Sequence, residues 1–547
     1  MDVRAIIRGA ALVAPAVVLR AQPCTPAWNP GFPALDGAVR ALAIFDDGGG
    51  PALFVGGSFT TAAGGQTLGR IAKWDGSAWR SVGGGLNGTV NAMMVYNDGS
   101  GPALFVGGAF TRAGGLGANG IAKWNGVQWT GLQQGVQWGV SQATTPPTPA
   151  PLAPGVVNAL AVFDEGAGPT LFVGGDFDSA GPSFAQGIAR WNGVWWSNVG
   201  QDFLTPGRPR FAPVYALAPV TLGGARMLAV GGGFRTDSVG PMLGQLAAWD
   251  GAAWSAVGFA SPVPTSATQP DGVLSLAAAA DQPGRPGALY VGLRIAAWAQ
   301  RGAVGRWQGP GALVEVYPPP ANIDGVGSLT VFDDGAGPAL YAGAALASAG
   351  YGAGLYRTPM AGFPAGAWAP VAGPPANGAV LATLVTGPGG VPGGLYVGGS
   401  FSQIGGVAAA RIARFGCAAA ATPGAFGLLQ PPNGAVAQAR NPAFQWQDAP
   451  TAGAVLYTVV VATDAALTNA VYTAANIVGT RHTPPANALP PGVRYFWGVR
   501  AANLAGSSPS APVSFSFATR AVGDANGDGT VDFADLVAVL GQYGVTP

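Results

Sequence analysis

The sequence is poor in charge, in histidine and in lysine. Only 9% of its 547 residues are charged, against about 25% in an average soluble domain. Its two lysines, Lys73 and Lys123, form no basic tract that could neutralise phosphates, which argues against nucleic-acid binding. A catalytic triad built on histidine would have to use His482, the only histidine in the chain. Low charge together with 49% hydrophobic residues also argues against an intrinsically disordered chain.

Long apolar runs are missing too. No run reaches the roughly 18–20 residues that cross a bilayer, so we predict no membrane span in the mature chain. Residues 1–21 instead have the layout of a secretory signal, with Arg4 and Arg8 before the apolar stretch 9–19 and a cleavage site after Ala21. We therefore expect a secreted, extracellular or cell-surface protein, with the periplasm as the alternative. A buried first strand or helix is the other interpretation of these residues.

Glycine (90 residues) and proline (48 residues) are abundant. Glycine does not recur at every third position, which excludes collagen. It clusters in an internal repeat, because PALFVGGSF at 51–59 returns as PALFVGGAF at 102–110 and PTLFVGGDF at 169–177. Seven copies follow one another at intervals of 51 to 67 residues. We number them repeats 1 to 7 by their anchor residues Val55, Val106, Val173, Val230, Val291, Ala342 and Val397.

Each repeat predicts four short strands. An apolar first strand ends in an Asp/Gly turn, and the second strand is the anchor run that ends in Gly-Gly. The third strand precedes an Asp-Gly or Asn-Gly pair, which is the strongest short signal for a hairpin. The fourth strand begins at a tryptophan five residues after another, in the pairs Trp74/Trp79, Trp124/Trp129, Trp191/Trp196 and Trp249/Trp254. Aspartates are usual turn residues, so we assign turn roles rather than metal binding to Asp46, Asp47, Asp98, Asp164, Asp333 and Asp334.

Four antiparallel strands repeated seven times predict an all-β fold, with a seven-bladed β-propeller over residues 22–417. The Gly-Gly pairs would let neighbouring blades approach closely because no Cβ intervenes, and the tryptophans would pack between blades. A β-solenoid is the alternative, although its repeats are usually shorter. The repeat resembles the kelch motif, in which a strand ending in Gly-Gly precedes two spaced aromatic residues. Kelch-type propellers serve both enzymes and binding proteins.

Two cysteines lie near the ends of the predicted propeller. Cys24 precedes a strand with no partner upstream, and Cys417 ends RIARFGC (411–417), a third strand with no fourth strand after it. Aligned to the repeat, both fall in the turn between strands three and four. We therefore predict that the N-terminal strand completes repeat 7 and that a Cys24–Cys417 disulfide fastens the ring. Two free thiols in a cytosolic protein are the alternative.

Residues 423–519 have longer alternating strands and no Gly-Gly anchor, which predicts an immunoglobulin-like β-sandwich. The stretch LPPGVRYFWGVRAANLAG (489–506) resembles a fibronectin type III domain, with Leu489, Gly492 and Tyr495 at the family's tyrosine corner. Trp446 would be the core tryptophan of an early strand. Such domains are usually spacers or binding modules.

Residues 521–547 contain a calcium-loop pattern followed by a short helix. GDANGDGTVDFAD (523–535) fits D-x-[DN]-x-[DN]-G, and hard oxygen ligands at this alternation bind one Ca²⁺. The predicted ligands are Asp524, Asn526, Asp528, the carbonyl of Thr530, Asp532 through water, and Asp535. The motif resembles a single type I dockerin repeat. A dockerin carries two such repeats, so a cohesin partner is doubtful. The alternative is a solvated tail rich in Asp and Gly.

The residues favour binding over catalysis. A kelch-type copper oxidase needs two histidine ligands, and the chain has one. We therefore predict a non-enzymatic secreted or cell-surface adhesion protein that binds a polysaccharide or a surface protein. Its candidate ligand face carries Trp138, Arg208 and Arg210, and its calcium motif would serve docking or assembly. A structural component of an extracellular matrix or cell-wall layer is the alternative, and a secreted glycoside-active enzyme is the third reading.

Overall fold

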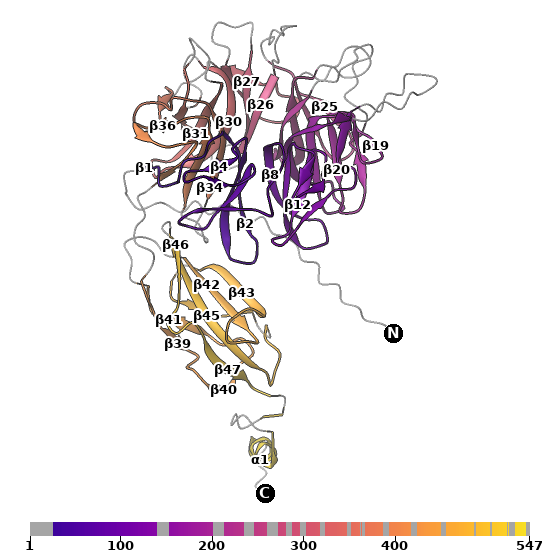
Figure 1. Ribbon diagram of the computed structural model, residues 1–547. Helices are drawn as coiled ribbons and strands as arrows, with labels where there is room; N and C mark the ends of the chain where they lie inside the picture. The colour runs from indigo at the N-terminus through magenta and orange to yellow at the C-terminus, as the bar shows by residue number, and fades with distance from the viewer. Residues whose placement is uncertain are drawn as a thin grey trace.

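The computed structural model describes residues 26–138, 153–200, 213–234, 245–259, 272–279, 287–295, 302–317, 323–346, 352–361, 363, 367–386, 393–416, 424–449, 456–477, 479–485, 488–503, 506–521, 523–524 and 531–542. Within these ranges the chain is almost entirely β-structure, with one helix, α1 (Phe533–Gln542), close to the C-terminus (Figure 1). The prediction of an all-β fold is confirmed.

Each of the seven repeats forms an antiparallel sheet of four strands, in the order first, second, third, fourth. Those of repeats 1 to 3 are β2 (Val39–Asp46), β3 (Pro51–Gly57), β6 (Ile71–Trp74) and β7 (Trp79–Ser81); β8 (Thr89–Asn97), β9 (Pro102–Ala109), β12 (Ile121–Trp124) and β13 (Trp129–Gly131); and β16 (Val156–Asp164), β17 (Pro169–Asp176), β20 (Ile188–Trp191) and β21 (Trp196–Asn198).

The sheets of repeats 4 to 7 have the same order. They are β22 (Val214–Leu222), β23 (Ala225–Gly232), β24 (Leu246–Trp249) and β25 (Trp254–Ala256); β26 (Gly272–Ala279), β27 (Ala288–Arg294), β28 (Gly302–Trp307) and β29 (Glu315–Tyr317); β30 (Asp324–Asp333), β31 (Pro338–Leu346), β32 (Leu355–Pro359) and β33 (Ala369–Pro370); and β34 (Val380–Thr386), β35 (Gly394–Gly399), β38 (Ile412–Gly416) and β1 (Ala27–Asn29).

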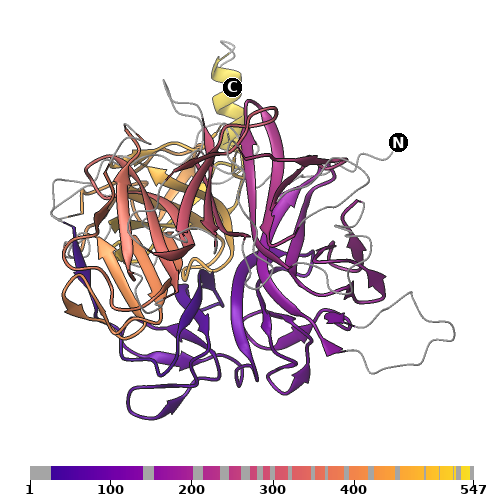
Figure 2. The ribbon, with the colours of Figure 1, turned by 90° about the horizontal axis from the view of Figure 1, so that it is seen from above.

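The N-terminal strand supplies the fourth strand of repeat 7. β1 pairs antiparallel with β38, with Trp28 opposite Phe415, as the unpaired N-terminal strand predicted. The first strands of successive repeats contact one another in turn, from β2 through β34, and β34 contacts β2 again. In Figure 2 the colours run once around these sheets, and the orange strands of repeat 7 lie beside the indigo ones of repeat 1.

Glycine sets the distance between neighbouring sheets. A Cβ added to Gly107 of β9 would lie 2.4 Å from Val157 Cγ1 on the first strand of the next repeat. At the closure of the ring, a Cβ on Gly398 would lie 2.5 Å from Val39 Cγ1. Side chains at these positions would force the sheets apart, so the predicted close approach at the Gly-Gly pairs is present.

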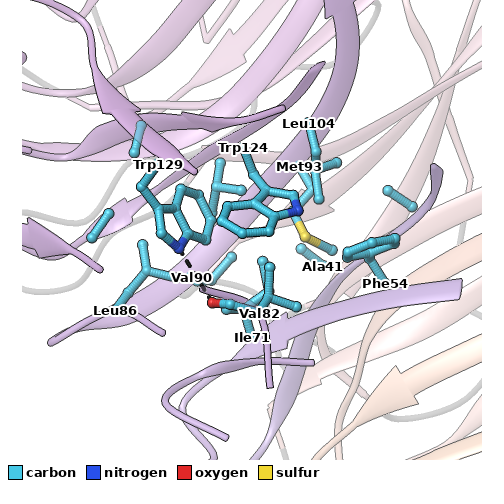
Figure 3. Packing of buried hydrophobic residues seen from close by; sticks show 14 of the residues in the cluster. Ala41, Phe54, Ile71, Val82, Leu86, Val90, Met93, Leu104, Trp124 and Trp129 are labelled. Carbon is cyan, nitrogen blue, oxygen red and sulfur yellow. Dashed lines mark hydrogen bonds between the residues drawn. The ribbon is translucent and has the colours of Figure 1, made fainter. Parts of the chain in front are cut away.

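The tryptophans pack between sheets and also form a repeated hydrogen bond. Trp124 and Trp129 lie with ring centroids 5.3 Å apart in a buried cluster between repeats 1 and 2 (Figure 3). The fourth-strand indole donates to a carbonyl of the preceding repeat in five places, with distances of 2.8–3.2 Å: Trp28 to Val371, Trp79 to Pro33, Trp129 to Val82, Trp196 to Leu132 and Trp254 to Val199. We call these bonds the tryptophan latches.

Short strands lie between the second and third strands of several repeats. They are β4 (Thr61–Ala62) with β5 (Gln66–Thr67), β10 (Arg112–Ala113) with β11 (Leu116–Gly117), and β36 (Gln403–Ile404) with β37 (Val407–Ala408). In repeat 3 the two short strands, β18 (Ser179–Ala180) and β19 (Ser183–Phe184), join a sheet with two strands that precede the repeat. The order in this sheet is β15 (Ala153–Pro154), β14 (Val136–Trp138), β18, β19.

After repeat 7, two sheets enclose a separate core that contains Trp446, Tyr495 and Trp497. One sheet has the order β39 (Leu428–Gln430), β41 (Phe444–Trp446), β44 (Arg481–His482). The other has the order β40 (Ala435–Gln438), β47 (Phe515–Thr519), β45 (Arg494–Asn503), β42 (Leu456–Ala462), β43 (Ala470–Ile477), with β46 (Gly506–Pro509) also paired to β45. The predicted core position of Trp446 is confirmed by its 2% exposure.

Candidate functional site

The two ends of the ring of first strands differ in how they are built. At one end the first strands begin and the second strands finish; we call it the start end. At the other, the hairpin end, a tight turn joins the first strand to the second. Every first strand has a register shift just after a valine near its beginning, as between Val39 and Ala41 or between Val214 and Ala216. A bulge re-aims the side chain of the extra residue, which in repeats 1 to 7 is Arg40, Asn91, Asn158, Tyr215, Leu274, Gly327 and Leu381.

Polar residues from four consecutive repeats gather at the start end. Asp176 ends β17, Tyr215 is the bulge residue of β22, Arg294 ends β27 and Asp324 begins β30. Because second strands finish where first strands begin, these four positions share one end of the ring. We call them the rim.

The rim contains a buried ion pair. Arg294 Nε donates to Asp324 Oδ1 at 2.8 Å, and the two side chains are only 7% and 2% exposed. Removing either partner would leave an uncompensated buried charge, so the pair fixes the guanidinium between repeats 5 and 6. Asp176 is half-buried, and its carboxylate is the more accessible one.

The hydroxyl of Tyr215 interacts electrostatically with one negative and one positive side chain. Burial raises the pKa of its hydroxyl, the negative charge of Asp176 raises it further, and the positive charge of Arg294 lowers it. The net effect is an increase, so the phenol keeps its proton at neutral pH. A protonated hydroxyl, an accessible carboxylate and a fixed guanidinium together can donate to, accept from and orient a polyhydroxylated ligand.

The hairpin end carries the same contacts several times. The turn residues Asp46, Asp164 and Asp333 each accept backbone N–H bonds from glycines two and four residues later. The next turn residue pairs with a base on the third strand: Lys73 with Asp47 at 2.5 Å, Lys123 with Asp98 at 2.7 Å, Arg190 with Glu165, and Arg357 with Asp334 at 3.3 Å. These aspartates act in turns and ion pairs, as their turn assignment predicted.

Of the candidate ligand face drawn from the sequence, Trp138 lies at the start end, in a strand that pairs with β18 (Ser179–Ala180) directly after Asp176. Trp138 is half-buried in β14, where it pairs with Ala153 of β15, and it is a strand residue rather than part of a loop. Arg208 and Arg210 lie outside the described residues. Sequence reasoning missed the rim. The sequence did carry one indication of it. Asp176 and Arg294 are charged residues at a single position of the repeat, which is Ser58 in repeat 1 and Ala109 in repeat 2.

The calcium motif is described in part. Asp524 and Asp535 are 3% and 4% exposed, and Asp535 Oδ2 accepts the backbone N–H of Asp532 at 2.8 Å. Two carboxylates buried this fully beside a short helix fit the chemistry of a hard-cation loop. Asn526, Asp528 and Thr530 lie outside the described residues, and within those residues no group of three or more His, Cys, Asp or Glu could hold a metal ion.

Two further sequence predictions concern export. Cys24 and Cys417 lie outside the described residues, as does the predicted signal segment 1–21. No helix in the described part of the chain is both long and apolar enough to cross a membrane.

Among known proteins, the chain is similar to solved structures. No family model matches the sequence, and no curated protein matches it. A crystal structure described as an ancestral GH74 enzyme is similar over 88% of this chain and 55% of that chain, with 13% sequence identity and a TM-score of 0.40. This chain therefore spans little more than half the length of that enzyme.

The comparison contradicts the main functional prediction, a non-enzymatic adhesion protein, because the neighbour is an enzyme, a glycoside hydrolase. It agrees better with the glycoside-active reading. At this identity and TM-score the likeness carries no argument for that activity, which has to come from the chain's own residues.

Proposed function

We propose that the protein is a glycoside-active enzyme whose site is the rim. The observation that carries the proposal is the gathering of Asp176, Tyr215, Arg294 and Asp324 from four consecutive repeats at one end of the ring, with Arg294 fixed by its buried ion pair with Asp324. Sugars present many hydroxyl groups, and carboxylates, phenols and guanidiniums are the groups that bind and orient them. Acidic and hydroxyl side chains also supply the proton transfers of glycoside cleavage.

The proposed roles follow from accessibility. Asp176 is the carboxylate that accepts a proton from the attacking water, because it is the less buried of the two. Tyr215 gives its hydroxyl proton to the glycosidic oxygen as the bond from that oxygen to the anomeric carbon breaks. The positive charge of Arg294 stabilises the phenolate that forms, and the proton taken up by Asp176 then returns to Tyr215 through solvent. Asp324 is a positioning residue, since its carboxylate is committed to Arg294.

The experiment is release of reducing ends from a panel of neutral and acidic polysaccharides by the full chain. Tyr215→Phe and Asp176→Asn should each lower kcat/KM by about a hundredfold or more, the usual contribution of a positioned proton-transfer group, while the melting temperature stays unchanged. Arg80→Gln, on the exposed fourth strand of repeat 1, is the control. Absence of cleavage on every substrate, or full activity in both rim variants, would refute the proposal.

We further propose that repeats 1 to 7 form a seven-bladed kelch-like propeller and that residues 423–519 form a fibronectin type III-like domain. The closed series of first-strand contacts supports the first proposal. The sheet orders β39-β41-β44 and β43-β42-β45-β47 support the second, because they place two antiparallel sheets face to face around Trp446.

We also propose that the C-terminal motif binds one Ca²⁺ through Asp524, Asp535 and the neighbouring oxygen ligands of the sequence pattern. The near-complete burial of the two carboxylates supports this proposal. Calorimetric titration of the full chain with Ca²⁺, in wild type and in Asp524→Asn, tests it. Equal heats from the two proteins would contradict it.

A further inference from the structure

One asparagine lies between the two rim residues to which proton transfer is assigned. Asn158 is the bulge residue of β16, two positions after Val156, and Val156 pairs with Asp176 in the sheet of repeat 3. Its side chain reaches the next repeat, where Asn158 Nδ2 donates to the carbonyl of Val214 at 3.1 Å. Val214 is the residue directly before Tyr215. A single residue therefore connects the strand pair that carries Asp176 to the bulge that carries Tyr215.

The amide of Asn158 is held in one orientation by the preceding repeat. Asn91, the bulge residue of repeat 2, donates from its own Nδ2 to the carbonyl of Val157 at 3.1 Å and to Asn158 Oδ1 at 3.4 Å. Because Oδ1 faces this donor, the NH₂ group of Asn158 is turned toward Val214. The hydrogen bonds thus run in one direction through three consecutive repeats and end at the residue before Tyr215.

Val214 is anchored to repeat 3 through its side chain as well. The side chain is fully buried, and a Cβ added to Gly174 of β17 would lie 2.6 Å from Val214 Cγ1. The carbonyl of Val214 is bonded to Asn158 and its side chain packs on Gly174, so repeat 3 fixes the backbone from which the Tyr215 side chain extends.

The position of the Tyr215 ring depends on this backbone. The side chain is half-buried, and in the described part of the chain no hydrogen bond engages its hydroxyl. Contacts at the hydroxyl therefore do not fix where the ring ends, whereas the bulge sets the direction in which the side chain points. A shift of the Val214 carbonyl would move the Tyr215 hydroxyl relative to Asp176.

We infer that Asn158 is a positioning residue that sets the separation between Asp176 and Tyr215. This inference rests on the proposed function, in which these two residues transfer the protons. Misplacement of a reacting group by about 1 Å lowers a rate by up to about a hundredfold. Loss of one hydrogen bond at Asn158 should therefore act on the reaction through Tyr215.

Other repeats supply both the variant and its control. Repeats 5 and 7 carry leucine at the bulge position, Leu274 and Leu381, so Asn158→Leu removes the donor with a residue that the fold accepts there. Asn158→Ala removes the same donor without adding an apolar side chain. Ser328→Ala removes a comparable bond between repeats 6 and 7, from Ser328 Oγ to the Val380 carbonyl at 3.3 Å.

Kinetics on the best substrate separate positioning from stability. Asn158→Leu and Asn158→Ala should each lower kcat by about tenfold with KM nearly unchanged, which is the pattern of a contribution made in the transition state. Ser328→Ala should keep both kinetic constants, with a similar fall in melting temperature. Wild-type kcat in the Asn158 variants, or an equal loss of kcat in Ser328→Ala, would overturn the inference.

Nitration of Tyr215 by tetranitromethane gives a second readout that needs no substrate. The reagent attacks the phenolate form, and burial together with the charge of Asp176 raises the pKa of Tyr215 and so slows the reaction. A ring released from this place reacts faster. At about pH 8, where ordinary tyrosines are only slightly ionised, peptide mass spectrometry should show several-fold faster nitration of Tyr215 in the Asn158 variants and an unchanged rate in Ser328→Ala.

The two readouts distinguish failure of the inference from failure of the proposed function. Faster nitration in the Asn158 variants, in a protein that cleaves no substrate, would refute the proposed function and leave the positioning of Tyr215 standing. Cleavage that is lost in Tyr215→Phe, with cleavage and nitration both unaffected by the Asn158 variants, would refute the inference alone.

Discussion

The start end and the hairpin end of the ring use polar residues in opposite ways. At the hairpin end the same aspartate turn and the same ion pair recur from repeat to repeat, as in Lys73–Asp47 and Lys123–Asp98. At the start end the polar residues vary among the repeats, and no other repeat has an aspartate, tyrosine or arginine at the position of Asp176, Tyr215 or Arg294 respectively, apart from the shared position of Asp176 and Arg294 themselves. A contact that every repeat needs serves folding, whereas a residue that one repeat alone carries is free to serve function.

Among the repeated contacts, loss of a tryptophan latch should lower the free energy of unfolding the most. Trp129→Ala removes a 4% exposed indole and its bond to the Val82 carbonyl, and should lower the free energy of unfolding by about 3–5 kcal/mol. Trp195→Ala, at 64% exposure on a neighbouring hairpin, should cost no more than about 0.5 kcal/mol. Denaturant titration measures the free energy of unfolding of both variants. Similar losses in the two would show that the buried indole and its hydrogen bond stabilise the fold no more than an exposed tryptophan does.

Substitution of a glycine at the contact between two sheets should cause the next largest loss of stability. Gly107→Ala places a Cβ 2.4 Å from Val157 Cγ1 and should cost about 1–3 kcal/mol through overpacking. Adding Val157→Ala in the same chain should restore part of that loss, because the two residues are in contact. A double variant as unstable as the sum of the single ones would mean that the sheets do not meet here.

The ion pairs of the hairpin end should have a smaller, pH-dependent effect. Burial raises the pKa of Asp98, but hydrogen bonds from Lys123 and Ser100 and the charge of Lys123 outweigh it, so the pKa is lowered overall. This contribution to stability is therefore complete above the unfolded pKa of about 4 and is lost as the pH falls through the lower folded pKa.

Lys123→Met should cost about 1–2 kcal/mol at neutral pH, and the difference from wild type should shrink below about pH 4. Arg226→Gln breaks a more exposed pair, 4.0 Å from Asp164, and should change stability by no more than about 0.5 kcal/mol. Thermal melts across acid pH test this, and a loss that does not depend on pH would contradict the assignment.

Substitution of Asp176, the accessible carboxylate of the rim, should have the smallest effect on stability. Asp176→Ser gives repeat 3 the residue of repeats 1 and 7, Ser58 and Ser400, and should change the free energy of unfolding by no more than about 0.5 kcal/mol. A large loss in denaturant titration would place Asp176 among the structural residues and remove the contrast between the two ends.

The sequence predicted the repeated features because each appears several times in the chain. The Gly-Gly pairs, the paired tryptophans and the aspartate turns each occur in at least three copies. The strand assignment therefore does not depend on the alignment of any one copy. The pairing of the N-terminal strand with repeat 7 followed from the same counting, since one strand was missing at each end.

The rim could not be predicted in the same way. Asp176, Tyr215 and Arg294 are each the single residue of their type at their position in the repeat, and the four rim residues are separated by up to 148 positions in the sequence. Only the closure of the first strands into a ring brings them to one end. The sequence-based ligand face names Trp138, Arg208 and Arg210 and none of the four rim residues, because loop length and exposed-looking aromatics do not show which strand-end residues the closed ring brings together.

The most direct test of the account is Tyr215→Asn, which gives repeat 4 the bulge residue of repeats 2 and 3. Asn91 and Asn158 each donate to a carbonyl of the next repeat at 3.1 Å, so asparagine fits the fold at this position. Melting temperature and cleavage of the best substrate are measured on the same preparation. We expect an unchanged melting temperature and the loss of cleavage; full cleavage, or a collapse of the melting temperature, would contradict a catalytic role of Tyr215.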